Sequence, residues 1–243
     1  MAEHQLEARR QPSASTSSPV AHSVHEFPLH MHSGLWTTRQ LVQLQRVVGN
    51  AAVQQLLESS TVIQRSEDES FGLTTGGVTP LQQPSSLACW ATVSTMMASY
   101  NDGQAYTIAD IPTVVGRAGP QYRQIYTANT GLSGSDKDAF LAAMGLTAEP
   151  PASYLARAVY NMMEAYGPLW VTTDGGSLDT VHARVLIGMG GDGTPTGTTM
   201  QIIDPADGAI HDETYAVFAR RYSNVGIGDA AAGVPFRAQI VHW

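Results

Sequence analysis

The sequence has little of what several large classes of protein need. Cysteine occurs once, at position 89, which excludes an intramolecular disulfide and a cysteine-rich zinc site. Lys and Arg total 13 against 21 Asp and Glu, and the formal net charge of −8 disfavours a nucleic-acid-binding surface. No apolar run approaches the roughly 18 residues of a membrane-spanning helix. The first 30 residues carry charges and lack the apolar core of a secretory signal peptide. These absences favour a soluble, acidic, globular protein.

The composition changes near residue 70. Residues 1–38 are rich in Ser, Gln, His and Pro and have almost no apolar periodicity, which is typical of a disordered tail. Residues 39–58 carry an approximate helical stripe of apolar side chains. A polar linker follows at 66–70. We therefore predict two parts: residues 1–70 as a mostly disordered leader with a short helix at about 39–58, and residues 71–243 as one folded domain.

Within residues 71–243, the apolar spacing predicts helices first and strands later. Helices are expected at 87–100, at 135–144 with Ser135 as the N-cap, and at 152–166. Strands are expected at 169–173, 181–189, 198–203 and 236–242. This order predicts an α+β domain rather than alternating βαβ units.

Cys89 lies at the start of the first expected helix. Free amide groups and the helix dipole stabilise a thiolate there, which favours a nucleophile. An isolated cysteine is more often an inert buried residue, but Trp90 and Ala91 follow Cys89 and Gln83 lies six residues before it. This segment resembles the papain-like cysteine peptidases, whose nucleophile begins a helix within a Cys-Trp-Ala signature. The resemblance implies that Gln83 helps to form the oxyanion hole, with Gln82 as the adjacent rival.

A thiolate nucleophile needs an acid–base partner, and three histidines follow Cys89. His182 begins an apolar strand that ends in glycine, and this pattern resembles the histidine-bearing strand of the family. His211 stands among acidic residues and is interpreted as an exposed turn or strand residue. His242 is one residue from the end of the printed sequence. We therefore expect His182 to be the partner of Cys89.

The third member of such a triad orients the imidazole. Papain uses Asn, whereas bacterial relatives, including the leader peptidases of bacteriocin exporters and some plant-pathogen effectors, use Asp in an apolar-apolar-Asp-Pro pattern. Residues 202–205 match that pattern and indicate Asp204. Asp207 is the alternative, although it precedes Gly208 as in a simple turn. Asp174 and Asp179 are interpreted as loop caps.

The resemblance covers roughly residues 79–210 in the order Gln, Cys, His, Asp. It implies a papain-like cysteine proteinase fold, with an N-terminal helical half that carries the nucleophile helix and a C-terminal antiparallel sheet. It also implies a hydrolase that cleaves a protein or peptide substrate through an acyl-enzyme and needs no cofactor. Residues 84–88 depart from the family, which usually has further Gly and Cys residues there, so the branch within the family stays open.

The leader contains a second resemblance. Residues 44–57 are similar to an element found in bacterial proteins associated with contractile injection systems. By analogy, residues 1–70 would be a loading or sorting leader and the peptidase a delivered effector or toxin. Such a protein would reside in the bacterial cytoplasm before export by a non-classical route, and an injection-system structure would be its partner. An ordinary amphipathic helix and a propeptide are the alternatives.

Four leader histidines, His22, His25, His30 and His32, have spacings that could bind a transition metal weakly. No predicted scaffold fixes their geometry, so we expect no metal site.

Two other functions remain open. The same Cys-His-Asp set serves deamidases, transglutaminases and acyltransferases, which differ in what attacks the acyl-enzyme. A papain-like fold can also persist as a catalytically inactive binding module, although nothing in such a module requires all four site residues.

Overall fold

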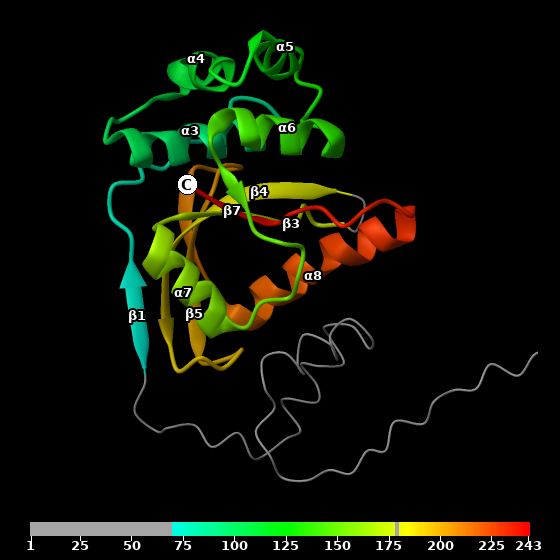
Figure 1. Ribbon diagram of the computed structural model, residues 1–243. Helices are drawn as coiled ribbons and strands as arrows, with labels where there is room; N and C mark the ends of the chain where they lie inside the picture. Colours follow the sequence, from blue (N-terminus) through cyan, green and yellow to red (C-terminus); the bar gives the residue numbers. More distant parts are fainter. Residues whose placement is uncertain (1–69, 178–179) are drawn as a thin grey trace, which may run out of the picture. The chain divides into compact units, whose positions relative to one another are not determined.

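Helices cover both faces of an antiparallel sheet in the computed structural model, which describes residues 70–177 and 180–243 (Figure 1). The helical segments are α3 (Cys89–Asp102), η1 (Ile108–Asp110), α4 (Ile111–Gly116), α5 (Pro120–Ala128), α6 (Gly134–Met144), α7 (Ala156–Tyr166) and α8 (Tyr215–Ala232). The strands are β1 (Phe71–Thr74), β2 (Thr147–Ala148), β3 (Leu169–Asp174), β4 (Val181–Gly191), β5 (Thr198–Asp204), β6 (Ala209–Thr214) and β7 (Ile240–His242). This mixture of helices and antiparallel strands is consistent with the expected papain-like domain.

The sheet is built around β4. Its strand order is β2-β7-β3-β4-β5-β6, and β1 pairs with the second half of β4, beyond the start of β3. Every pairing is antiparallel. Strands β4 and β5 run antiparallel, with Val185 opposite Ile203. The first residues of β4 therefore lie close to the end of β5. His182 and Asp204 occupy those two positions.

The sheet separates two hydrophobic cores. Alternate residues of a strand point to opposite faces, and β3 shows the consequence: Trp170 packs against α3 and α6, whereas Leu169 and Val171 pack against α7 and α8. The first core also contains the buried face of α3, including Val93 and Met97. The nucleophile helix is therefore fixed on one face of the sheet.

The expected helices are present, with adjusted ends. The helix expected from residue 87 is α3 and begins at Cys89 itself, with Ala88 as its N-cap. The helix expected at 135–144 is α6, but Ser133 caps it instead of Ser135, because the Ser133 hydroxyl accepts the backbone N–H of Asp136 at 3.1 Å. The helix expected at 152–166 starts later, at Ala156.

The expected order of helices before strands is wrong at the C-terminal end. An 18-residue helix, α8, follows β6 and packs its buried residues against β3 and β5. Tyr215, Phe218, Tyr222 and Val225 form its buried stripe. The strand expected at 236–242 shortens to β7, and β1, β2, β6, η1, α4 and α5 had not been expected.

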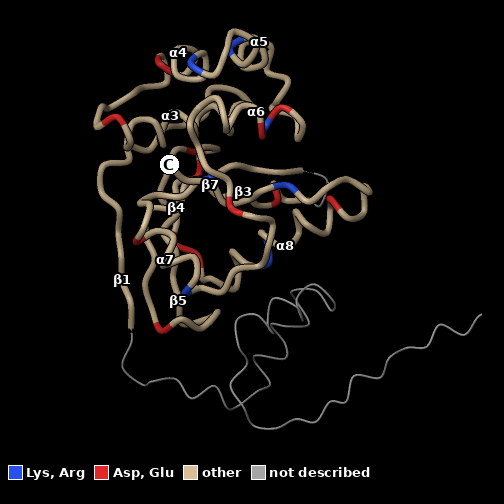
Figure 2. Tube along the Cα trace, viewed as in Figure 1, with Lys and Arg blue, Asp and Glu red and all other residues tan. Residues whose placement is uncertain are grey.

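The predicted leader lies outside the described residues, except for Ser70 at its end. Among the described helices, none combines the length and apolar character needed to cross a bilayer. Lys and Arg lie scattered among acidic residues along the described trace (Figure 2).

Candidate active site

Cys89 is the first residue of α3 and is partly accessible. The first amide groups of a helix have no intrahelical acceptor, and they create a positive potential at this end. The thiol receives hydrogen bonds from the His182 ring and from the backbone N–H groups of Ala183 and Trp90. Burial raises the pKa of Cys89, but these hydrogen bonds and the charge of His182 outweigh it and lower the pKa below its ordinary value.

The residue after the nucleophile anchors the helix. Trp90 is buried and meets the ring of Phe140 edge to face, with the ring centroids 5.1 Å apart. This contact fixes α3 against α6, so the Cys-Trp pair places one side chain in the site and the next one in the core.

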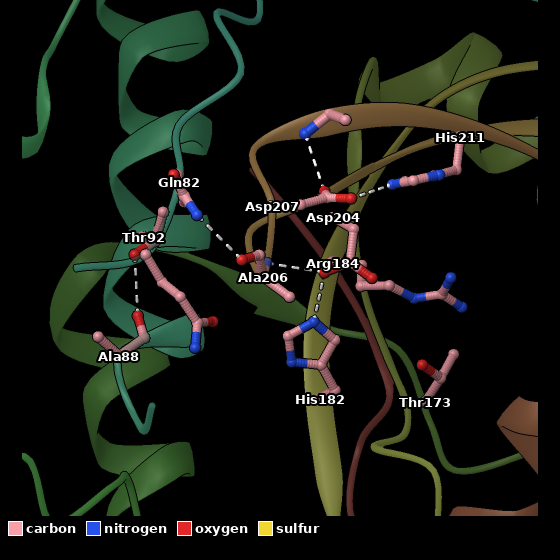
Figure 3. Close-up of polar contacts among 12 residues, drawn as sticks. Gln82, Ala88, Thr92, Thr173, His182, Arg184, Asp204, Ala206, Asp207 and His211 are labelled. Carbon is pink, nitrogen blue, oxygen red and sulfur yellow. Dashed lines mark hydrogen bonds and ion pairs between the residues drawn. The ribbon is translucent and has the colours of Figure 1, made fainter. Parts of the chain in front are cut away.

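His182 lies near the start of β4 and connects Cys89 to Asp204. Its Nε2 lies 2.6 Å from Asp204 Oδ1, as Figure 3 shows. A carboxylate only accepts, so Nε2 carries a proton, and Nδ1, which carries the second proton of the charged ring, is left to donate to the sulfur of Cys89. Burial lowers the pKa of His182, but its hydrogen bonds to Asp204 and Cys89 and their charges raise it to about 9. The imidazole is therefore held in its charged form at neutral pH.

Asp204 is the last residue of β5. Besides His182, its Oδ1 accepts the backbone N–H of Ala206 at 2.9 Å (Figure 3). Burial raises the pKa of Asp204, but the hydrogen bonds from His182 and Ala206 and nearby positive charge lower it to about 2. The carboxylate stays ionised and accepts hydrogen bonds across the physiological range.

A buried ion pair lies beside the Asp204 carboxylate, and the sequence analysis did not predict it. Arg184, also on β4, donates two hydrogen bonds to Glu213, at 3.2 and 3.0 Å, and its side chain is only 2% exposed. Arg221 on α8 lies 3.5 Å from the carboxylate of Glu213. The charge of Arg184 contributes to the low pKa of Asp204. No short motif could have revealed these contacts, because Arg184, Glu213 and Arg221 lie on β4, β6 and α8.

Gln83 lies in the segment that leads to Cys89. Its Nε2 donates to the carbonyl oxygens of Ser85 at 2.9 Å and Ser86 at 3.2 Å, and its Oε1 is buried without a hydrogen-bond partner. Its backbone N–H donates to the carbonyl of Pro205 at 2.7 Å. The rival, Gln82, is exposed and donates from Nε2 to the Ala206 carbonyl at 3.4 Å (Figure 3). Both glutamines therefore contact the loop that follows Asp204.

The alternative residues lie elsewhere. Asp207 and His211 are exposed and pair with each other at 2.8 Å (Figure 3). His242 is buried in β7, where its Nε2 lies 3.0 Å from Glu149. Asp174 accepts the backbone N–H of Gly176, as a loop cap does, and also pairs with Arg221. The structure thus brings Cys89, His182 and Asp204 together and leaves these other groups apart.

The expectations for the leader histidines and for Asp179 cannot be compared with the structure. These residues lie outside the described ranges. Within the described ranges, no group of three or more His, Cys, Asp and Glu residues is arranged to hold a metal ion.

Comparison with known proteins shows the family of this chain. A family model described as papain-like cysteine protease AvrRpt2 matches residues 75–223, a range that contains Cys89, His182 and Asp204. No curated protein matches the chain. The match confirms the expected papain-like cysteine peptidase, while the bacteriocin-exporter branch and the injection-system leader stay predictions. Because the matched range spans more than half of the 243 residues, the chain belongs to the papain-like cysteine protease family of AvrRpt2.

Proposed function

We propose that the protein cleaves peptide bonds through a triad of Cys89, His182 and Asp204. One observation carries the proposal: an unbroken series of hydrogen bonds runs from the Cys89 thiol through the His182 ring to the Asp204 carboxylate. Family membership supplies the reaction class, cysteine peptidase. The family match does not by itself assign the roles of individual residues.

The charges support this assignment. The lowered pKa of Cys89 and the raised pKa of His182, about 9, favour a thiolate–imidazolium pair at neutral pH. The thiolate attacks the carbonyl carbon of the peptide bond. The carbon–nitrogen bond then breaks as His182 gives its proton to the leaving amine. Water, deprotonated by the now neutral His182, releases the acyl group and regenerates the thiol pair.

The oxyanion of the tetrahedral intermediate needs donors. The backbone N–H of Cys89, at the start of α3, is one candidate, and the side-chain amide of Gln83 is the other. In the free protein this amide donates to Ser85 and Ser86. The contact to Ser86 is the longer one, at 3.2 Å, so we propose that it is exchanged for the substrate oxygen during the reaction.

Product analysis tests the reaction. The full chain, a Cys89→Ala variant and a Gln82→Ala variant would be incubated with denatured casein and the products analysed by mass spectrometry. We expect new peptide termini with the wild type and Gln82→Ala, and none with Cys89→Ala. Gain of about 1 Da without cleavage would indicate a deamidase, and cross-linked or acylated products a transferase. No product together with an unreactive thiol would indicate a binding module.

We also propose that the peptidase is a bacterial effector, acting as a toxin in a target cell, with residues 1–70 as its loading leader. The composition of residues 1–70 and the resemblance of residues 44–57 support this. On this proposal, deletion of residues 1–70 abolishes export through an injection-system structure by a non-classical route, and leaves peptidase activity intact. Loss of folding on deletion would contradict the leader. Removal of the leader in the wild type but not in Cys89→Ala would indicate a propeptide.

A further inference from the structure

The loop between Gln83 and Cys89 is held by one side chain from a distant helix end. Asn129 Oδ1 accepts hydrogen bonds from the Ser85 hydroxyl at 2.9 Å and from the Leu87 backbone N–H at 3.0 Å. Its Nδ2 donates to the Ser86 hydroxyl at 3.4 Å. Of the two polar atoms of the Asn129 amide, only the oxygen accepts from a backbone N–H, so the contact to Leu87 fixes the orientation of the amide. Asn129 therefore contacts three consecutive residues of this loop.

The backbone of Asn129 indicates that its side chain matters. Asn129 is the C-cap of α5 with φ +50°, and among the described residues it is the sole non-glycine with a positive φ. Helices α3, α6 and α8 end in the same left-handed conformation with Gly103, Gly145 and Gly233. Glycine adopts this conformation without steric cost. At α5 a side chain is kept despite that cost, and this side chain reaches the loop before the nucleophile.

The loop in turn orients Gln83. The Gln83 amide donates to the carbonyl oxygens of Ser85 and Ser86, two of the residues that Asn129 holds. The same Ser85 carbonyl accepts the backbone N–H of Ala88, the N-cap of α3, at 3.2 Å. A series of contacts thus links Asn129 to Ser85 and Ser86 and then to the Gln83 amide.

We propose that Asn129 is a positioning residue for oxyanion stabilisation, because it holds residues 85–87 in the conformation that places the Gln83 amide beside the attacked carbonyl. This proposal rests on the proposed function. Asn129 itself contacts the loop and acts on the reaction through Gln83. Its removal should therefore impair reactions that form an oxyanion at Cys89, and spare reactions of the same thiol that do not.

Two reagents for Cys89 separate these cases. With p-nitrophenyl acetate, a sulfur–acyl bond forms, the ester carbon–oxygen bond breaks and nitrophenolate leaves, through an oxyanion intermediate. With iodoacetamide, a sulfur–carbon bond forms as iodide leaves, and no oxyanion arises. Cys89 is the one thiol of the chain, so both rates report on this residue once the background measured with Cys89→Ala is subtracted. The two rates would be measured on the full chain, with thermal unfolding recorded for every variant.

The variants isolate the amide side chain. Asn129→Gly keeps the left-handed backbone and removes all three contacts. Asn129→Asp keeps the oxygen that accepts from Ser85 and Leu87. Thr130→Ala changes an exposed neighbour and serves as the control. In Asn129→Gly we expect acylation to slow by about 10²-fold, as for the loss of one oxyanion donor, and alkylation to stay within about twofold. Asn129→Asp should recover most of the acylation rate.

A double-variant cycle tests the route through Gln83. If Asn129 acts through that amide, then Asn129→Gly adds little to the loss already caused by Gln83→Ala. Full additivity would overturn the proposal, as would an unchanged acylation rate in Asn129→Gly. A parallel fall in acylation, alkylation and unfolding temperature would also overturn it, because it would indicate a purely structural cap. A wild-type thiol inert to both reagents would instead overturn the proposed function and this inference together.

Discussion

The backbone N–H of Gln83 donates a 2.7 Å hydrogen bond to the carbonyl oxygen of Pro205, across more than 120 residues of sequence. This bond joins the segment before the nucleophile to the loop after Asp204. The two sides of the candidate site are therefore linked by the backbone as well as through His182. Four predictions test the candidate site and the contacts that support it.

The first concerns the two aspartates of the loop. Asp204→Asn keeps an oxygen for the Ala206 N–H but removes the carboxylate that fixes the His182 tautomer. We expect kcat to fall by about 10³–10⁴-fold with the fold retained. Asp207→Asn, on an exposed residue that pairs with His211, is the matched control and should keep full activity. Steady-state kinetics on a cleaved peptide measure both. The reverse result would assign the third role to Asp207.

The second concerns pH. The reactive pair exists above the lowered pKa of Cys89 and below the pKa of His182, about 9. Peptide cleavage should therefore rise with pH as Cys89 loses its proton, and decline as His182 loses its proton near pH 9. In His182→Ala, the hydrogen bond and the charge of His182 no longer oppose burial, so the pKa of the thiol should rise and alkylation by iodoacetamide at neutral pH should slow.

His211→Ala serves as the control for that experiment, since His211 is exposed and pairs with Asp207 instead. Its alkylation profile should match the wild type. A Cys89 profile that does not change in His182→Ala would contradict the nucleophile–base pair.

The third concerns Gly208, which lies in the loop after Asp204 and close to the backbone of Gln82. Gly208 has φ +70°, and a Cβ there would lie 2.9 Å from the backbone nitrogen of Gln82. Gly208→Ala should therefore displace residues 82–83, weaken the bond from Gln83 to Pro205 and lower both stability and kcat. Gly233→Ala has a similar φ, +66°, with no atom within 4 Å of the added carbon. It should show only the backbone strain, about 1–2 kcal/mol. Denaturant unfolding and kinetics compare the two, and equal losses would show that the contact with Gln82 is unimportant.

The fourth concerns the buried ion pair. Glu213→Ala leaves the Arg184 guanidinium, 2% exposed, with an uncompensated charge. Removal of one partner of such a pair costs about 3–5 kcal/mol. Asp212→Ala, at the exposed neighbouring residue, should change the free energy of unfolding by less than about 0.5 kcal/mol. Urea denaturation followed by tryptophan fluorescence would measure both. A loss below about 1 kcal/mol for Glu213→Ala would mean that Arg184 reaches water or another partner.

Local sequence predicted the central elements because their signals are short-range. The apolar spacing from Leu87 to Tyr100 and Gly103 after it define α3, and Gly145 and Gly167 end α6 and α7. Helix α8 was missed, although Tyr215, Phe218, Tyr222 and Val225 carry a helical spacing. Glycines at 226 and 228 interrupt that pattern, and packing against β3 and β5 stabilises the helix.

The sequence by itself determined the chemical types available: one thiol, a histidine at the start of an apolar strand, and an aspartate before a proline. Tertiary structure decided which of them meet. The antiparallel register of β4 with β5 places His182 beside Asp204, while Asp207, three residues on, faces solvent. The tertiary structure also brings Asn129 into contact with residues 85–87 and Arg184 into contact with Glu213. Such contacts join residues far apart in the chain, so only the folded packing of strands and helices specifies them.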